Sequence, residues 1–307
     1  MDSGRGRSHP PTLIRLVERT VREECRIGRG DKVLVATSGG GDSTALLHVL
    51  ARLAKKFGFS LAAHGVDHGL RTDAASELDL AASLAERLGV TFSRTLVKCP
   101  PGGNLQARAR ELRREALERA AAENGARWIA TAHHADDRAE TVLIRLLHGG
   151  SPSALAVLPA RDGRWIRPMI RARRSDVAAH LTRHCLDYAS DPSNVNRRFL
   201  RVRVRMELMP LLEELSPGIV GHLTALADEL SGTALPIVSD AAGRPVPLRR
   251  AHVRELRRAA ELGQAVTIRI SGGRDVTFTR EASKKAGTVA QAATVGEKGG
   301  AKTRKSG

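Results

Sequence analysis

The chain has 307 residues and is 41% hydrophobic, which is enough for a sizeable core and suggests one large domain with a smaller one. It has no run of about 18 apolar residues and no apolar signal core near its N-terminus, so we expect a cytoplasmic protein without a membrane partner. Its 50 Lys and Arg against 33 Asp and Glu give a net charge of +17, which indicates a polyanionic partner such as a nucleic acid.

Strands and helices are predicted to alternate through the first half of the chain. In chain order we expect a helix over 12–27, a strand over 32–37, a helix over 43–58, a strand over 60–67, a helix over 73–90, a strand over 91–99, a helix over 104–125, a strand over 127–132 and a helix over 135–150. This alternation predicts βαβ units and therefore an α/β fold with a doubly wound parallel sheet, which binds ligands at the carboxyl ends of its strands.

From about Arg161 the pattern turns helical and basic. Helices are expected over 175–185, 203–215 and 219–232, followed by a hairpin from 264–270 and 275–280. The predicted organisation is therefore a helical lead-in (1–30), a catalytic domain (31–217), a small, mostly helical C-terminal region (218–280) and a disordered basic tail (281–307).

The basic charge is concentrated in one segment. Between Arg161 and Arg205 there are twelve Arg against four Asp, a net charge of +8. The chain has only five Phe, two Trp and one Tyr, so it has few aromatic side chains that could stack on unpaired bases. We therefore expect it to recognise the backbone and shape of a folded nucleic acid. The alternative is a solvated, Arg-rich surface. The three scattered cysteines argue against a thiolate-held metal or iron–sulfur cluster.

The stretch "ATSGGGDST" (36–44) lies between a predicted strand and a predicted helix. Backbone N–H groups and the helix dipole converge there, and glycines allow close approach of an anion. The stretch lacks the lysine of a Walker A loop, and Thr44 stands where a dinucleotide fingerprint has its third glycine. An acid in a phosphate-binding loop is repulsive unless a cation intervenes, so Asp42 suggests a divalent metal bridge. A simple strand–helix turn, with Asp42 favouring the helix start, is the alternative.

These residues carry a family resemblance. Ser38-Gly39-Gly40-Gly41-Asp42-Ser43 resembles the SGGxDS signature of the PP-loop ATP pyrophosphatases, which have an adenine nucleotide alpha-hydrolase-like fold. Within that superfamily, "VDHGLR" (66–71), "GNLQARARELR" (103–113), "TAHHADDRAETVLIRLL" (131–147), "RPMI" (167–170) and "DPSNVNRRFLRVRVRMELMPLLEEL" (191–215) resemble the tRNA(Ile)-lysidine synthetases in the same order. The resemblance covers roughly residues 20–225.

The resemblance implies an ATP-dependent ligase that joins L-lysine to C2 of the wobble cytidine of the CAU-anticodon isoleucine tRNA. ATP would adenylate the base and release pyrophosphate, and the amine of lysine would then expel AMP. ATP and Mg²⁺ are the implied cofactors. Ser38, Gly39, Gly40, Gly41, Asp42, Ser43, Thr44 and Asp67 are then the expected ATP-binding residues, and Asp42 and Asp137 the expected metal ligands.

The acidic stretch and the arginines complete the expected site. The resemblance implies that Asp42, Arg110, His133, Asp136 and Asp137 are the catalytic residues. Asp136 or Asp137 would share the metal or accept the proton of the lysine amine, and His133, four residues before Asp137, would assist. Carboxylates at a helix start are also stabilised by the helix dipole, which is the alternative. Arg110 could clamp a phosphate or a carboxylate. Arg201, Arg203 and Arg205 would share a face if extended and spread around the axis if helical. They are expected to bind tRNA phosphates, with surface solvation as the alternative.

The chain also departs from the family pattern. Arg114, Ala132, Asn196 and Val202 stand where the family usually has Tyr, Gly, Asp and Asn, and most of these departures concern the substrate-side contacts rather than the ATP site. Two other functions remain open: another PP-loop tRNA-modifying enzyme such as a 2-thiocytidine synthetase, and a non-catalytic basic RNA-binding protein. The sequence leaves the oligomeric state open, a homodimer being one option.

Overall fold

The computed structural model describes residues 11–67, 74–97, 105–189, 197–231, 266–270 and 274–278. The chain divides into two compact units, Met1–Ser231 and Gly232–Gly307, each of which is described by itself. The first unit extends beyond residue 217, the expected end of the catalytic domain, because the next helix packs within it.

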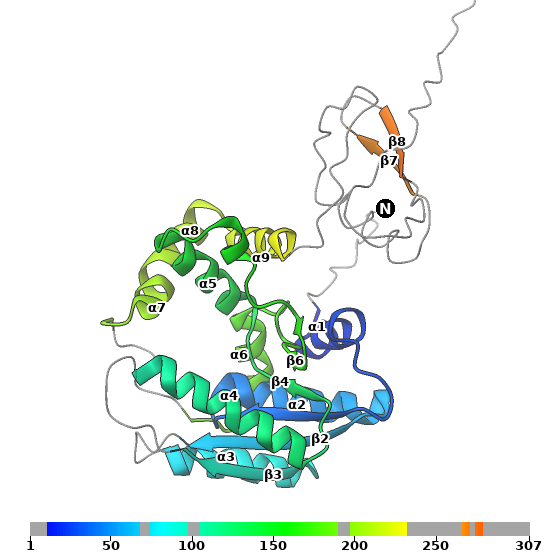
Figure 1. Cartoon of the computed structure of the whole chain (residues 1–307), viewed down its shortest axis with the longest axis vertical. Coiled ribbons are helices and arrows are strands. Elements are labelled where there is room, and N and C mark those ends of the chain that lie inside the picture. The colour runs from blue at the N-terminus through cyan, green and yellow to red at the C-terminus, as the bar shows by residue number, and fades with distance from the viewer. Residues whose placement is uncertain are drawn as a thin grey trace, which may run out of the picture. The chain divides into compact units, whose positions relative to one another are not determined.

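The predicted alternation of strands and helices is confirmed in the first unit (Figure 1). A lead-in helix α1 (Leu13–Thr20) continues into a π-helical turn η1 (Val21–Cys25). The elements that follow are β1 (Lys32–Thr37), α2 (Gly41–Phe57), β2 (Ser60–Asp67), α3 (Ala74–Arg87), β3 (Thr91–Leu96), α4 (Leu105–Glu123), β4 (Trp128–Ala130) and α5 (Ala135–Leu147).

The segment after α5 differs from its prediction at one place. A helical pattern is expected from residue 161 onward, but β5 (Arg161–Asp162) and β6 (Trp165–Ile166) form a short hairpin, and β6 pairs in parallel with β4. The reason is tertiary, because two-residue strands have no periodicity of their own and depend on the sheet edge beside them. The other elements are η2 (Pro152–Leu155), α6 (Arg174–Arg183), α7 (Leu200–Arg203), η4 (Val204–Leu208), α8 (Met209–Leu215) and α9 (Ile219–Leu230).

The sheet has the strand order β3-β2-β1-β4-β6-β5 and is parallel except for β5 at its edge. The chain proceeds from β1 to β2 and β3 on one side and then returns to place β4 on the other side of β1. The strand order therefore reverses between β1 and β4. In such sheets the loops after these two strands diverge and leave a crevice in which ligands bind.

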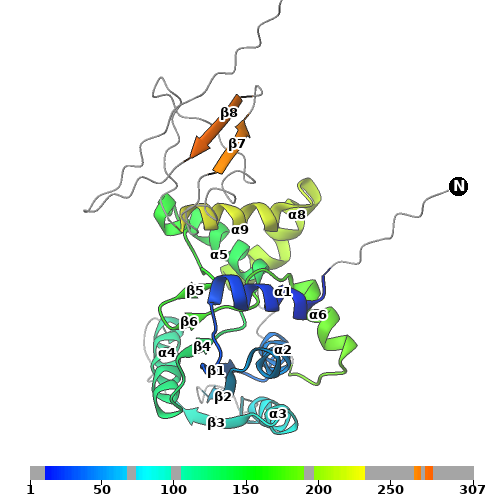
Figure 2. The same ribbon diagram turned by 90° about the vertical axis from the view of Figure 1, so that its right-hand side faces the viewer.

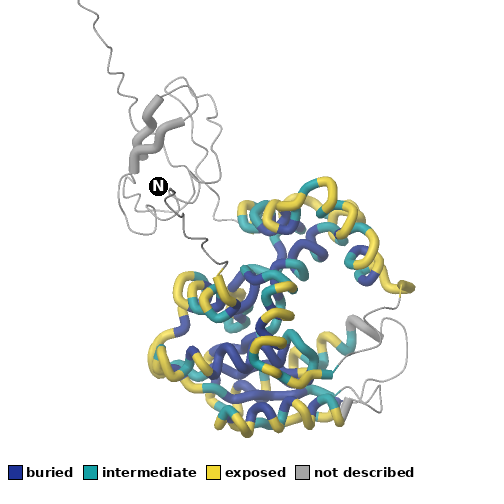
Figure 3. The backbone as a smooth tube through the Cα atoms, turned by 180° about the vertical axis from the view of Figure 1, so that it is seen from behind, coloured by how far each residue is buried: buried dark blue, intermediate teal, exposed yellow. Residues whose placement is uncertain are grey.

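Helices cover both faces of this sheet. Figure 2 shows α2 and α3 on one side and α4 on the other. Val33 and Val35 join a core with α1, α2 and α6, whereas Leu34 and Ala36 join a separate core with α4. Successive residues of β1 thus point to opposite, buried faces, as expected of a central parallel strand. The burial view shows the same strands enclosed between half-exposed helices (Figure 3).

A further core lies beyond the sheet. Helices α5 and α9 pack through Ala139, Val142, Leu223 and Ala227, all buried. This packing brings α9 into the first unit, although its residues fall within the predicted C-terminal region.

In the second unit, β7 (Val266–Ile270) and β8 (Arg274–Phe278) pair antiparallel, which confirms the expected hairpin. The basic tail predicted over 281–307 lies outside the described residues. None of the helices that the structure describes combines the length and the apolar character needed to cross a bilayer.

Candidate active site

The loop between β1 and α2 depends on glycine at position 39. Gly39 has a φ of +77°, in the left-handed region, and a Cβ at this position would overlap the backbone carbonyl of Glu77 on α3. Both the backbone angle and the close approach of α3 therefore require a residue without a side chain. The first of the expected anion-binding glycines thus shapes the loop.

Side chains and a neighbouring segment hold the loop in place. The backbone N–H of Ser38 donates to Ser43 Oγ at 3.1 Å, and Ser43 Oγ donates to the carbonyl of Gly40 at 2.9 Å. From outside the loop, the N–H of Ala189 donates to the carbonyl of Gly39 at 2.9 Å. Ser43 is thereby buried under the loop, whereas Ser38 remains exposed and available to a ligand.

A cavity of about 1200 Å³ opens at the crevice between β1 and β4. This volume exceeds the roughly 300–1,000 Å³ of common small-molecule pockets, so it can hold a nucleotide together with part of a second substrate. Arginines outnumber carboxylates in its lining, which favours anionic ligands. The charged lining residues are Arg110, Arg113, Arg114, Arg145, Arg167, Arg174 and Arg201 with Asp42, Glu77, Glu111, Asp137 and Asp162.

His134 lies at the centre of the acidic residues of the site. It is the N-cap of α5, where its Nδ1 accepts from the N–H of Asp137 at 3.4 Å while Asp137 Oδ2 accepts from the N–H of His134 at 3.1 Å. Its ring is fully buried, and its Nε2 lies 3.4 Å from Asp137 Oδ2 and 3.8 Å from Asp42 Oδ2 without a hydrogen bond to either. Although burial lowers the pKa of His134, the carboxylates of Asp136, Asp137 and Asp42 outweigh it and raise that pKa above its usual range.

Asp42 occupies the first turn of α2, where the helix dipole favours a carboxylate. Its side chain is 48% exposed toward the cavity, yet the surrounding protein removes much of its hydration. This desolvation, helped by the Asp137 carboxylate and opposed by His134, raises the pKa of Asp42. A cation beside Asp42 would relieve the repulsion between the two carboxylates.

His133 and Asp137 both line the cavity. The His133 ring shares a 2.9 Å hydrogen bond between its Nδ1 and Thr131 Oγ1. Burial lowers the pKa of His133, the Asp137 carboxylate raises it, and nearby arginines lower it again. The net result is a pKa of about 4. For Asp137, burial alone would raise the pKa, but His134, His133 and Arg201 lower it below its usual range. At neutral pH the pair is therefore a neutral imidazole beside a carboxylate.

Asp136 is not among the residues that line the cavity. Its carboxylate accepts from the backbone N–H of Arg174 at 2.8 Å and from Arg173 Nε at 3.2 Å, so it fixes the start of α6 against α5. The neighbouring His134 and these arginines outweigh its burial and hold the pKa of Asp136 far below the usual range. Of the three acids expected to be catalytic, Asp42 and Asp137 line the cavity and Asp136 does not.

The three arginines expected to contact tRNA lie on the helical segment α7–η4, so they do not share one face. Arg201 and Arg205 both bind Glu140 of α5, with Arg201 Nε 3.0 Å from Oε2 and Arg205 Nε 2.8 Å from Oε1. Arg203 is exposed and pairs with Glu207 on its own helix at 3.2 Å. Arg201 also lines the cavity and contacts Asp137 Oδ1 at 3.2 Å.

The structure thus brings most of the expected site together around one cavity and leaves some members beside it. Gly39 and Thr44 are buried, and Asp67 stands at the carboxyl end of β2; none of the three lines the cavity. The expected residues that do line it are Ser38, Gly40, Gly41, Asp42, Ser43, Arg110, His133, Asp137 and Arg201.

Two residues of the site are not among those expected from the sequence. His134 is easily passed over for its neighbour His133, although a polar residue three positions before Asp137 at a helix start is a recognisable capping signal. Arg113 is turned into the cavity from α4, and burial, followed by the charge of Arg110, lowers its pKa. Only the packing of α4 against the sheet distinguishes it from the exposed arginines of that helix.

The structure shows the surroundings of three of the four residues that depart from the family pattern. Arg114 stacks over the Trp165 ring at 5.3 Å and donates to Glu118 at 3.2 Å, so it acts as a wall of the cavity. Ala132 lines the cavity, whereas Val202 is buried. Asn196 lies outside the described residues.

Comparison with known proteins gives one consistent result. Residues 14–212 match the PP-loop domain family. The chain is 39% identical over 232 residues to the tRNA(Ile)-lysidine synthase of Symbiobacterium thermophilum, covering 72% of this chain and 48% of the relative. It is 37% identical over 230 residues to that of Thermobifida fusca, covering 74% and 71%. The chain thus spans about half the length of several curated relatives and more of others.

A solved structure shows the same fold. The U34-tRNA thiolase NcsA from Methanococcus maripaludis, determined with its [4Fe-4S] cluster, matches with a TM-score of 0.59 over 76% of this chain and 86% of that chain. The sequence identity is 21%, so this likeness concerns the arrangement of the sheet and helices alone.

Proposed function

The chain belongs to the PP-loop family and, within it, to the tRNA(Ile)-lysidine synthases, and from this premise we propose that it ligates L-lysine to C2 of the wobble cytidine of a CAU-anticodon isoleucine tRNA. The single observation that carries the proposal is the cavity in which the glycine loop, Asp42, Asp137 and several arginines face one another. Since ATP and tRNA are both cytoplasmic, we propose that compartment as well.

The reaction has two steps. In the first, O2 of the cytidine attacks the α-phosphorus of ATP, and pyrophosphate leaves. In the second, the amine of lysine attacks C2 of the adenylated base, the C2–O bond breaks and AMP leaves with that oxygen. The attacking nitrogen gives up a proton, which a nearby base accepts. No oxidant or reductant is required.

In the first step the chain's contribution is positioning and charge. The N-terminus of α2 directs its dipole and free backbone N–H groups at the loop, which suits the leaving phosphates. Ser38, Gly40 and Gly41 line the cavity there, and arginines on α4 and α6 face it from two other sides. Holding two substrates in reactive geometry is worth up to about 7–11 kcal/mol of barrier.

Mg²⁺ fits the donor atoms at this place. Asp42 and Asp137 supply oxygen ligands, which this ion prefers, and both approach the same unpartnered His134 Nε2. We propose that Asp42 is the principal ligand, since one oxygen of Asp137 is already shared with Arg201. When bound, the ion would neutralise phosphate charge.

In the second step Asp137 is the proposed proton acceptor. It lines the cavity, whereas Asp136 is held by Arg173 and Arg174. The low pKa of Asp137 keeps its carboxylate ionised, and this weak base can accept the proton because the nitrogen becomes strongly acidic once it has attacked. His133, neutral at pH 7, would orient the amine by hydrogen bonding.

For the tRNA we propose contacts from the α7–η4 segment. Arg203 is exposed and is suited to a phosphate, whereas Arg201 and Arg205 would act nearer the reacting base because they adjoin Asp137. The charge of +17 supports a polyanionic substrate.

A thiolation reaction is not favoured. Of the cysteines that the structure describes, Cys25 is buried and donates to the carbonyl of Ala160, and Cys185 is exposed. These environments differ from those of paired, cavity-facing thiolates. The iron–sulfur cluster of the thiolase therefore has no described counterpart here.

The decisive experiment incubates the protein with ATP, labelled lysine and the CAU-anticodon isoleucine tRNA. We expect the label to enter the tRNA, and AMP and pyrophosphate to form. Asp42→Asn should abolish incorporation while leaving tRNA binding intact, whereas Asp79→Asn, a change of an exposed aspartate on α3, should leave both unchanged. Folded protein that binds the tRNA but incorporates no lysine would establish the non-catalytic alternative.

A further inference from the structure

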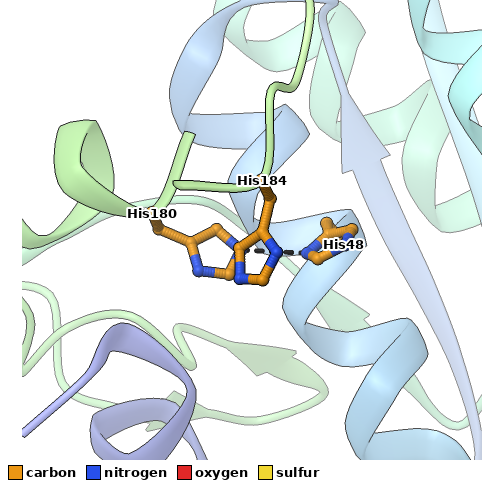
Figure 4. Close-up of side chains that lie close together, drawn as sticks. All are labelled: His48, His180 and His184. Atoms are coloured by element: carbon orange, nitrogen blue, oxygen red, sulfur yellow. Dashed lines mark hydrogen bonds between the residues drawn. The ribbon is translucent and has the colours of Figure 1, made fainter. Parts of the chain in front are cut away.

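Three histidines meet on the other side of α2 from the sheet, away from the acidic residues of the candidate site. His48 comes from the middle of α2, His180 from the last turn of α6 and His184 from the C-cap of α6 (Figure 4). His48 Nδ1 lies 2.9 Å from His180 Nε2, so that one ring donates a hydrogen bond to the other. The three ring centroids are 4.4–5.0 Å apart.

The position of this cluster is unusual for polar rings. His48 is 9% exposed and His180 5% exposed, and each lies on the apolar, packed face of its helix. The bond between the two rings uses one nitrogen of each, and the second nitrogen of each ring is not among the buried polar atoms left without a partner. Apolar side chains more often fill a buried contact between helices. The meeting of three imidazole rings between α2 and α6 therefore invites an explanation from their donor chemistry.

The donor atoms have the chemistry of a transition-metal site. One ring nitrogen from each histidine lies within 4.8 Å of the others, and no carboxylate belongs to this group among the described residues. Imidazole nitrogens suit Zn²⁺, Cu²⁺ and Ni²⁺, whereas Mg²⁺ and Ca²⁺ require oxygen ligands. Burial, followed by the charge of His184, lowers the pKa of both His48 and His180 to about 4, so both rings are available as neutral ligands at neutral pH.

The spacing is close to what a tetrahedral ion needs. With Zn–N bonds of about 2.0–2.1 Å, two ligand nitrogens stand about 3.3 Å apart, so the His48–His180 pair has to open by only a few tenths of an ångström. His184 is half-buried at the end of its helix and can close the remaining distance by rotating its side chain. Arg52 and Arg183 lie nearby and oppose a dication, which sets the expected affinity below that of a site with acidic neighbours.

We propose that His48, His180 and His184 form a zinc-binding site that joins α2 to α6, with water as the fourth ligand. The two helices both reach the cavity: α2 begins at Gly41, and the segment after α6 donates from Ala189 to the carbonyl of Gly39. An ion at the cluster therefore holds the glycine loop against α6. Its role is structural, because the cluster's residues do not line the cavity.

Metal binding by the tag-free full-length chain tests the proposal directly. The protein is stripped with a chelator and titrated with ZnCl₂ against a chromophoric competitor, and Co²⁺ is added separately as a spectroscopic probe. We expect one Zn²⁺ per chain, a rise in the melting temperature on zinc addition and a tetrahedral Co²⁺ spectrum. A large excess of Mg²⁺ should not compete.

Variants locate the site. His184→Ala removes a half-buried ligand with little packing and should weaken zinc binding by more than about 100-fold, beyond the 10–100-fold usual for residues outside the coordination sphere. His180→Asn should do the same. His222→Ala, a change of an exposed histidine on α9, is the control and should bind like the wild type.

The proposal is overturned if the stripped wild-type chain binds no zinc at micromolar concentrations, or if His184→Ala binds as tightly as the wild type. Should His180→Asn fail to fold, the His184→Ala result decides. Because the readout is metal content, it is independent of whether lysine enters tRNA.

Discussion

Arg205 and Glu140 form a two-bond ion pair across the helices α5 and η4, with Arg205 Nε 2.8 Å from Oε1 and Nη2 3.1 Å from Oε2. Glu140 also binds Arg174 and Arg201, so one buried carboxylate holds together three cations from two segments, α6 and α7–η4. This carboxylate therefore sets the position of Arg201 beside Asp137 in the cavity.

Replacing Glu140 with Gln should destabilise the protein substantially. Three arginines would lose their common counter-ion, and removing one partner of a buried ion pair costs about 3–5 kcal/mol. Because these arginines are 22–41% exposed and can turn toward water, we expect a loss near the lower limit. Glu207→Gln, which breaks only an exposed i,i+4 pair, should cost about 0.5 kcal/mol or less. Urea unfolding of both variants checks this, and equal losses would contradict the assigned role.

A comparison of Gly39 with Gly30 separates backbone strain from steric overlap. Both have positive φ, +77° and +82°, but an added Cβ at Gly30 meets nothing within 4 Å, whereas at Gly39 it overlaps Glu77. Gly30→Ala should therefore lose about 1–2 kcal/mol and keep ATP binding. Gly39→Ala should lose more and weaken ATP binding at least tenfold, as measured by calorimetry. Similar affinities in the two variants would show that α3 does not constrain the loop.

The ion pairs of Asp228 lead us to expect that the free energy of unfolding falls at acidic pH. Burial alone would raise its pKa, but hydrogen bonds and charges from Arg171 and Arg138 hold the pKa below the usual 3.8. The Asp228 carboxylate therefore contributes its full share to the free energy of unfolding above the pKa that Asp228 has in the unfolded state. This contribution is lost as the pH falls through the lower pKa that Asp228 has in the folded state. Asp228→Asn strands the fully buried Arg138 and should cost about 3 kcal/mol at pH 7.

Denaturation at several pH values tests this linkage. The difference in unfolding free energy between wild type and Asp228→Asn should stay constant from pH 7 to about 5 and shrink below about pH 4. Glu214→Gln, at an exposed position of α8, should show a difference within about 0.5 kcal/mol throughout. A difference that does not change with pH would mean that Asp228 keeps its usual pKa.

Arg203 should contribute to tRNA affinity without affecting stability. Arg203→Ala removes one exposed cation and is expected to reduce the slope of log affinity against log salt by about one for each phosphate that this side chain neutralises. Arg19→Ala is a matched control, because Arg19 also forms an exposed i,i+4 pair, with Glu23 at 3.1 Å. Filter binding of the isoleucine tRNA at several salt concentrations measures both slopes. Unchanged slopes in Arg203→Ala would remove α7 from the tRNA interface.

Local sequence was sufficient for most elements and for the position of the glycine loop. Helix and strand periodicity depend on residues only a few positions apart, so β1, α2 and the hairpin β7–β8 could be predicted without knowing the fold. The meeting of the glycine loop with the stretch 133–137 could also be predicted, because parallel strands bring their carboxyl ends to one edge. The short strands β5 and β6 could not, since they form only against β4.

The tertiary structure alone decided which partners the charged and polar side chains contact. Arg203 and Arg205 are two residues apart, yet one faces solvent and the other Glu140, because the helix rotates successive residues to different surroundings. Likewise, His48 and His180 are 132 positions apart and meet only because α2 packs against α6. Sequence determines which residue types are present and which elements they form, whereas ion pairing, burial and metal-binding geometry depend on distances that only the packed elements set.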